Sequence, residues 1–303
     1  MQPTSRTEVT RAQPEQLQTD WTFPAIYFAT ASSLQSLPSF RHVSREKLSQ
    51  AAMDMTIVAL GIRTGYLFDA FAIRDKRRSL KEVLVECLNS LRKGIPQFAA
   101  IVLLHEAAFE QLFFVNVHRL HQRHTEVARN VPTSTGAAGP VPLVTFIQLG
   151  SSNTEIYPPP PQLLPLFADI LSQLDREAVL PLEVSLSVDT QDMGTMVAFA
   201  ACVLDFPVAY DPTYSGPFLA GVPLDVYECT LELDDPRSAG LPEKHVMLKF
   251  SCPHSVAEST AELHAEAVIR TLKARFEGGL AESGYPGRMV VRHSMETLDR
   301  VAL

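Results

Sequence analysis

Apolar residues along this chain repeat with two alternating periods, one of three to four residues and one of two residues. The longer period is that of a helix with one buried face, and the shorter one is that of a half-buried strand. Helices are predicted at residues 44–61, 79–94, 118–128, 163–174, 190–204 and 255–278. Strands are predicted at residues 66–71, 100–105, 112–117, 143–149, 182–188, 224–233, 245–250 and 288–293. This order predicts an α/β fold, a mixed sheet with helices on its faces.

Polar residues indicate where several of these helices begin. Ser44 is expected to cap the first helix, because its side-chain oxygen can accept a hydrogen bond from a free amide of the first turn. The S-x-x-E pattern of a capping box occurs at residues 79–82 and again at residues 255–258. Either Asp189 or Thr190 is expected to cap the helix at residues 190–204.

The predicted elements divide the chain into a tail and one domain. Residues 1–22 show almost no apolar periodicity, which is typical of a disordered tail. Residues 23–303 are expected to form a single α/β domain. The Pro-, Gly- and Thr-containing segment at residues 130–142 is interpreted as a flexible loop within it, because neither half of the chain has a complete set of strands by itself.

Composition excludes several classes of partner. The chain has 46% apolar and 20% charged residues, a net charge of −8 and an isoelectric point near 5.6. This acidic balance argues against nucleic acid as a partner. The longest apolar runs, at residues 98–104 and 197–204, are far shorter than the ~20 residues that span a bilayer, so no membrane association is expected. Without a signal-peptide pattern, the expected location is the cytosol or nucleus.

The four cysteines, Cys87, Cys202, Cys229 and Cys252, are widely spaced. Zinc sites built on thiolates usually contain closely spaced cysteine pairs, and this chain has none. The cysteines are therefore interpreted as buried free thiols in a reducing compartment.

Recognised catalytic motifs are missing from the sequence. His105 and Glu106 begin a string like the zinc-binding HExxH, but Phe109 stands where the second histidine must be. Asp69 follows an apolar strand as a phosphatase nucleophile does, yet the second acid of that motif is missing. The sequence contains no GxSxG, P-loop or GxGxxG pattern.

Polar residues nevertheless gather at the predicted carboxyl ends of strands. Asp69, His105, Glu106, Asn116 and Asp189 all lie at or near such ends, where open α/β sheets form a ligand crevice. Among them we select Asp69, His105 and Asp189 as candidate catalytic residues, because two carboxylates and an imidazole could perform acid–base chemistry or bind a divalent ion. The alternative interpretation is that each residue caps a helix or binds loop amides.

Three histidines recur on the helix predicted at residues 118–128. His118, His121 and His124 are three residues apart, whereas metal-binding pairs on a helix usually lie four apart. Together with Arg119 and Arg123 they are interpreted as a solvated face.

Four short strings resemble an uncharacterised eukaryotic family that is named after an open reading frame on human chromosome 1. They are GYLFD at residues 65–69, FFVNV at 113–117, FPVAY at 206–210 and GVPLD at 221–225. The resemblance covers most of the chain from about Met55 onward. It implies an intracellular eukaryotic protein, and it implies no activity, cofactor or catalytic residue.

The sequence leads to two hypotheses about function. The first is an intracellular binding or adaptor protein that acts on a protein or small-molecule partner without catalysis. The alternative is a hydrolase or transferase that acts on a small anionic or phosphorylated molecule at the strand-end crevice. The hydrolase or transferase hypothesis requires Asp69, His105 and Asp189 to converge in one pocket, and the binding hypothesis does not. The sequence identifies neither a cofactor nor a metal, and it does not determine the substrate, the oligomeric state or the strand order.

Overall fold

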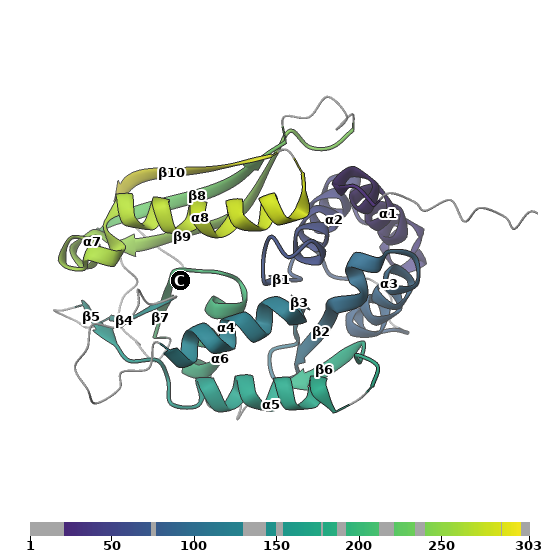
Figure 1. Cartoon of the computed structure of the whole chain (residues 1–303), viewed down its shortest axis with the longest axis horizontal. Helices are drawn as coiled ribbons and strands as arrows, with labels where there is room; N and C mark the ends of the chain where they lie inside the picture. The colour runs from purple at the N-terminus through teal and green to yellow at the C-terminus, as the bar shows by residue number, and fades with distance from the viewer. Residues whose placement is uncertain are drawn as a thin grey trace, which may run out of the picture.

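The computed structural model describes residues 21–73, 77–129, 144–149, 154–176, 178–186, 192–211, 221–233, 240–285 and 287–297 (Figure 1). Most of the predicted tail (residues 1–20), the loop at 130–142 and Asp189 lie outside these ranges. At the start of the described chain, Trp21 packs against the core and Thr22 precedes the first helix.

The first of three sheets is mixed and has the strand order β1-β3-β2-β6. Its strands are β1 (Gly65–Leu67), β2 (Ile101–Glu106), β3 (Gln111–Asn116) and β6 (Glu183–Leu186). Strand β3 is antiparallel to both β1 and β2, and β6 is parallel to β2. Strands β1, β2 and β6 therefore run in one direction and share one carboxyl edge.

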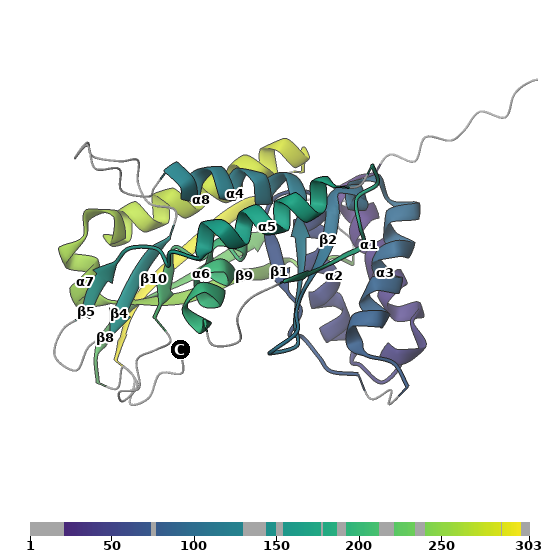
Figure 2. The same ribbon diagram turned by 90° about the horizontal axis from the view of Figure 1, so that it is seen from below.

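Helices cover both faces of this sheet. Its strand residues alternate between two apolar clusters, with Leu103 in one and Val102 and Leu104 in the other. On the Leu103 side lie α1 (Phe23–Ser36), α2 (Arg45–Ala59) and α3 (Leu80–Gly94). On the opposite side lie α4 (Val117–Arg129), α5 (Leu163–Asp175) and α6 (Met193–Val203). Figure 2 shows α1, α2 and α3 grouped beside β1 and β2.

The second sheet, β5-β4-β7, is small and lies beyond α6. It consists of β4 (Thr145–Leu149), β5 (Thr154–Tyr157) and β7 (Val208–Tyr210). Strand β4 is antiparallel to β5 and parallel to β7.

The third sheet, β10-β8-β9, is antiparallel and has the longest strands. They are β8 (Pro223–Glu232), β9 (Lys244–Pro253) and β10 (Arg288–Thr297). Helix α7 (His254–Ser259) packs on β8 and β9, and α8 (Ala265–Ser283) packs along β10 (Figure 1). Three short 3-10 helices, η1 (Pro38–Phe40), η2 (Pro96–Ala100) and η4 (Ala261–Leu263), complete the described helices.

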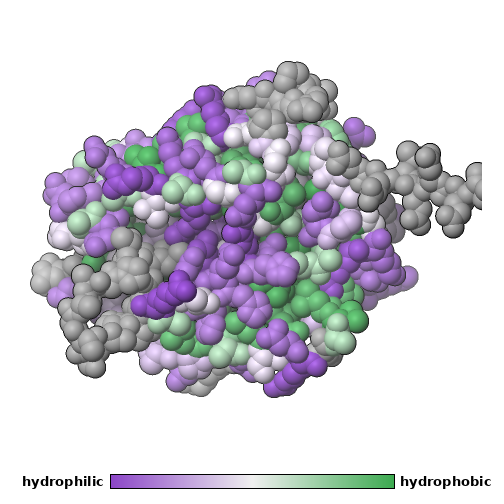
Figure 3. All heavy atoms as spheres, in the orientation of Figure 1, coloured by the Kyte–Doolittle hydropathy of each residue, from purple (hydrophilic) through white to green (hydrophobic). Residues whose placement is uncertain are grey.

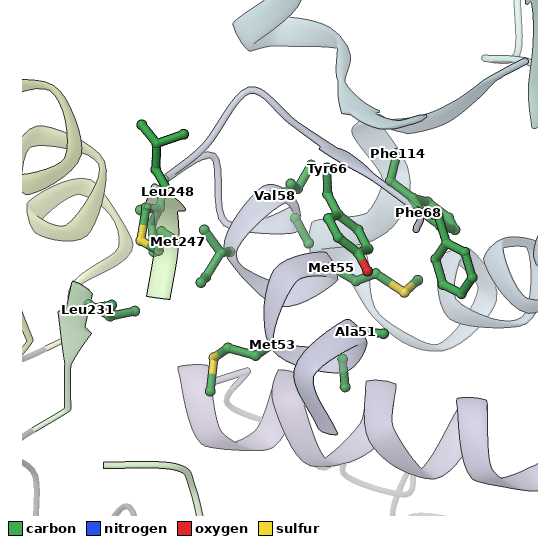
Figure 4. Packing of buried hydrophobic residues seen from close by; sticks show 14 of the residues in the cluster. Ala51, Met53, Met55, Val58, Tyr66, Phe68, Phe114, Leu231, Met247 and Leu248 are labelled. Carbon is green, nitrogen blue, oxygen red and sulfur yellow. The ribbon is translucent and has the colours of Figure 1, made fainter. Parts of the chain in front are cut away.

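Helix α2 joins the cores of the first and third sheets. Figure 4 shows Met55 on the side of Tyr66 and Phe114, whereas Met53 lies on the side of Leu231. From Ala51 to Ala59 every residue except Asp54 is buried, so the second half of α2 is enclosed on nearly all sides, whereas Arg45, Glu46 and Lys47 at its start are exposed. The second half must lie inside the molecule, because it leaves no polar face for solvent.

A buried ionic cluster links the helices and sheets around α2. Asp205 is 1% exposed and accepts hydrogen bonds from the Thr64 backbone amide at 2.8 Å and from Arg123 Nη2 at 2.7 Å. Arg63 donates to the carbonyl oxygens of Met247 and Leu204. Burial alone would raise the pKa of Asp205, but Arg123, Arg275 and the Thr64 amide outweigh that effect and hold the pKa below its usual value.

The predicted α/β class is confirmed, and the strands divide among three sheets. Helix α1 and strands β5 and β7 were not predicted. The buried stripe of α1 includes the small residues Thr30 and Ala31, and Phe28 lies 43% exposed outside it. These two features weaken the apolar period that a helix prediction relies on.

Two predicted helix starts are wrong. The side chain of Asp192 caps α6 by accepting a hydrogen bond from the Thr195 amide, so the helix begins after the predicted caps. The helix predicted at residues 255–278 is two helices, because extended Thr260 separates α7 from the segment that leads into α8. No side chain caps the start of α7. Helix α8 continues to Ser283, and the next residue, Gly284, adopts the left-handed conformation with φ +68°.

Hydrophilic side chains dominate the middle of the face shown in Figure 3, over the region where α4 and α8 approach each other. An ion pair of 2.6 Å between Arg119 and Glu282 joins these two helices. Among the described helices, none combines the length and the apolar composition that crossing a bilayer requires.

Candidate functional site

The polar residues predicted at the carboxyl ends of strands lie at two different edges of the first sheet. Asp69 and His105 belong to strands that share a carboxyl edge, whereas Asn116 ends the antiparallel strand β3 and lies at the opposite edge. Asn116 instead binds the Val58 carbonyl and the Arg119 amide at the start of α4. It therefore does not contribute to a crevice with the other candidates.

Asp69 follows β1 and His105 lies on β2, and these two strands are not neighbours in the sheet. Strand β3 lies between β1 and β2, which separates the strands of the two residues by about 10 Å, twice the spacing of neighbouring strands. Asp69 is exposed, and His105 is 8% exposed. Because Asp189 lies outside the described residues, the structure does not place it.

His105 lies beside two carboxylates, but neither is within hydrogen-bond distance. Its Nε2 atom is 3.7 Å from Glu110 and its Nδ1 atom is 3.9 Å from Glu183. Glu183 forms a shorter ion pair of 2.9 Å with Lys81. The Nε2 atom is buried and makes no hydrogen bond to any described group. The imidazole is thus enclosed rather than presented to a ligand.

Glu106, the neighbour of His105, stabilises a turn. Its carboxylate oxygens accept hydrogen bonds of 2.8 Å from the backbone amides of Ala108 and Phe109 in the connection between β2 and β3. This agrees with the alternative interpretation, in which the polar residues at strand ends satisfy loop amides.

A polar cluster that the sequence did not indicate lies at one end of the third sheet. Asp225 on β8 has 4% of its side chain exposed, and its two carboxylate oxygens bind different imidazoles. One oxygen lies 2.9 Å from His254 Nδ1 and the other lies 2.7 Å from His293 Nε2. About a third of each imidazole is exposed, since their exposed fractions are 31% and 27%. We call these three residues the Asp225 cluster.

The Asp225 cluster raises the basicity of His254. The hydrogen bond with Asp225 is the main cause that raises the pKa of His254, and the charges of Asp225 and Glu258 act in the same direction. Glu258 lies 3.2 Å from His254 Nε2, one turn along α7. Glu258 therefore contacts His254 in place of the capping box with Ser255 that its sequence pattern predicts.

Aromatic rings and a thiol surround the cluster on the same sheet. Tyr227 stacks between His293 and Phe250, with ring centroids 5.0 Å and 4.9 Å apart. Its hydroxyl is buried and has no hydrogen-bond partner among the described residues. Cys252 lies opposite Asp225, and burial followed by the Asp225 charge raises its pKa to about 12. Cys252 therefore remains a thiol at neutral pH and is not a nucleophile.

The Asp225 cluster belongs to a series of charge pairs across the third sheet. Two acidic residues of β8 lie directly opposite basic residues of β10, Glu228 with Arg292 at 3.9 Å and Glu232 with Arg288 at 2.6 Å, and on the other face of the sheet Asp225 pairs diagonally with His293. Lys244 on β9 also contacts Glu232, at 3.0 Å. This series joins the central strand to its neighbours by opposite charges.

The cluster has two chemical capacities. Because Asp225 binds Nδ1 of His254 and Nε2 of His293, it fixes both rings, and the second nitrogen of His254 faces Glu258 at 3.2 Å. The same bonds tie β8, β10 and the start of α7 together. No sequence motif indicated this set, since the three residues come together only through strand register.

The interpretation of α4 as a solvated face needs a correction. Arg123 is 9% exposed and pairs with Asp205, and Arg119 donates to the Gly61 carbonyl at 2.6 Å. His124 stacks on Phe167 and His121 lies 3.8 Å from Asp175. In the described part of the chain, no group of three or more histidine, cysteine, aspartate or glutamate side chains is arranged to hold a metal ion.

Comparison with known proteins identifies no relative. No protein-family model matches the chain, and no curated protein and no solved structure is significantly similar to it.

Proposed function

We propose that this chain is a non-enzymatic binding or adaptor protein of the cytosol or nucleus. One observation carries the proposal: Asp69 and His105, which the crevice chemistry requires together, lie on strands that β3 separates. The four cysteines are buried free thiols, which supports a reducing compartment. The net charge of −8 favours protein or small-molecule partners over nucleic acid.

The second candidate is a hydrolase or transferase that acts on a small anionic or phosphorylated molecule. A specific observation favours it, namely that Asp225 orients His254 through Nδ1 and leaves Nε2 toward Glu258. A histidine held in this way can act as a general base. Against it, the thiol of Cys252, which lies opposite Asp225 in the sheet, has a raised pKa and is therefore not activated as a nucleophile.

Turnover of generic substrates distinguishes the two candidates. The full chain and the variants Asp225→Asn, His254→Gln and His118→Gln are assayed with p-nitrophenyl phosphate and p-nitrophenyl acetate. His118 is exposed on α4 and serves as the matched histidine control. The binding function predicts the same background rate for all four proteins. Turnover that falls tenfold or more in the Asp225 and His254 variants, but not in the control, would establish the enzyme instead.

Thermal stability in the presence of metal ions separately tests the predicted crevice of Asp69, His105 and Asp189. Thermal unfolding of the full chain and of Asp69→Asn is followed with and without Mg²⁺, Mn²⁺ or Zn²⁺. A metal that binds only the native state must raise its melting temperature. We expect no rise in either protein. A rise in the native chain that Asp69→Asn removes would restore the crevice hypothesis and overturn the proposal.

A further inference from the structure

Strand β10 is a long edge strand. All ten of its residues pair with β8, from Arg288 opposite Glu232 to Thr297 opposite Pro223. The strand order β10-β8-β9 leaves its other side without a strand neighbour among the described residues, and Figure 1 shows it outermost in the third sheet. Alternate amide and carbonyl groups of β10 therefore point away from β8, where another strand can bind them.

The second half of β10 is exposed and charged. Arg292 has 64% of its side chain exposed, and Met295 is one of the large apolar residues on the surface, at 56%. Glu296 lies four residues after Arg292 and accepts a hydrogen bond of 3.0 Å from the Ser294 hydroxyl. Arg292, Ser294 and Glu296 share one face of the strand, because side chains alternate along a strand.

We propose that β10 pairs with β10 of a second copy of this chain, antiparallel, about a twofold axis at Ser294. This register puts Arg292 of each copy opposite Glu296 of the other, and Ser294 opposite Ser294. Opposed residues in antiparallel strands have Cβ atoms about 4.5–5.5 Å apart, close enough for an ion pair. On the other face, Met295 lies opposite His293 of the second copy and loses much of its contact with water.

The charges select this axis over the two axes that lie two residues away on the same face of the strand. An axis at Arg292 would oppose two arginines, and an axis at Glu296 would oppose two glutamates, and like charges directly opposite destabilise a strand pair. At Ser294, both charged residues meet the opposite sign. The contact is isologous, so it closes after two copies and joins two three-stranded sheets into one of six strands.

A second copy of the chain as the partner makes the proposed binding function more specific, and this inference rests in part on that proposed function. A strand pair of this length is a small interface of the weak class, below about 1,200 Å². We therefore expect a dimer whose population depends on concentration in the micromolar range. Because the readout is the oligomeric state, a monomeric result removes this inference and leaves the turnover test of the proposed function unaffected.

Charge reversal in the full chain tests the register. Sedimentation velocity between about 1 and 200 µM should show a dimer for the native chain, and the Kd should rise tenfold or more in Arg292→Glu and in Glu296→Arg. The double variant Arg292→Glu with Glu296→Arg should restore the dimer, since it exchanges the two charges. Glu296→Arg is the single variant that is easier to interpret, because Glu296 lies opposite the uncharged Leu224 within the chain. Arg292 lies opposite Glu228, so Arg292→Glu also places two like charges together within one copy.

A cysteine at the axis supplies a second measurement. In Ser294→Cys the two thiols would lie opposite each other, so mild oxidation should produce a disulfide-linked dimer. Ser36→Cys, at an exposed position on α1, controls for random collision, and the four native cysteines are buried. A chain that stays monomeric at every concentration, with no more crosslinking at position 294 than at position 36, overturns the proposal. So does protection of position 294 by a different protein while the purified chain remains monomeric.

Discussion

The carboxylate of Asp205 and the guanidinium of Arg123 lie 2.7 Å apart in the interior, with 1% and 10% of their side chains exposed. Thr64 binds both groups, since its amide and hydroxyl donate to Asp205 and its hydroxyl oxygen accepts from Arg123 Nε. This relationship joins the turn after α6, helix α4 and the segment before β1. Loss of the Asp205 charge would therefore affect all three segments at once.

Replacing Asp205 with Ala should destabilise the protein by about 3–5 kcal/mol, because the change removes the buried partner of Arg123. Glu126 is the matched control: it also pairs with Arg123 but is 41% exposed, and Glu126→Ala should cost less than about 1 kcal/mol. Urea denaturation of both variants measures the difference. Equal losses would mean that solvent reaches the Arg123 pair with Asp205.

The Asp225 cluster should make stability depend on pH. The pKa of His254 is raised in the folded state, so its contribution is fully present below the unfolded value, about 6.5, and is lost as the pH rises through the folded value. Asp225→Asn removes the main cause of the shift. The His254 pKa, followed by NMR of labelled imidazole, should then move down toward its ordinary value, and the decline in melting temperature over that pH window should flatten. An unchanged His254 titration in Asp225→Asn would contradict the assigned hydrogen bond.

Two adjacent glycines in α8 should respond oppositely to Ala. A Cβ at Gly279 would lie 2.7 Å from Ile62 Cα, a backbone atom that cannot move away cheaply, whereas a Cβ at Gly278 would meet nothing within 4 Å. Gly279→Ala should therefore cost about 1–3 kcal/mol. Gly278→Ala should stabilise the chain by up to about 1 kcal/mol, because Ala is the better helix former. The denaturation midpoints of the two variants measure the difference. Similar midpoints would show that α8 does not pack against Ile62 as closely as described.

The two S-x-x-E patterns give a matched pair of cap substitutions. Ser79 accepts a hydrogen bond of 3.2 Å from the Glu82 amide, and the Glu82 carboxylate accepts one of 2.9 Å from the Ser79 amide. Ser79→Ala should cost about 1 kcal/mol. Ser255 makes no capping bond at the start of α7, so Ser255→Ala should change stability by less than about 0.5 kcal/mol. A larger loss at Ser255 than at Ser79 would reverse this assignment.

Local patterns in the sequence were sufficient for much of the fold. The α/β class, the Ser44 cap of α2 and the Ser79 capping box of α3 were predicted and are present. Each depends on residues close together in the chain, because helical period, capping and strand alternation are short-range properties.

The tertiary structure decided which distant charged groups meet. The sequence left open whether Asp69 and His105 converge, and the strand order places β3 between the strands from which they come. It did not indicate that Asp225, His254 and His293 form a cluster, nor that Arg123 is buried against Asp205. Strand order and register are set by the packing of the whole chain, and a shift of one residue would turn every side chain of a strand to the other face. The sequence alone therefore determined most of the elements, and only their packing determined which distant groups come together.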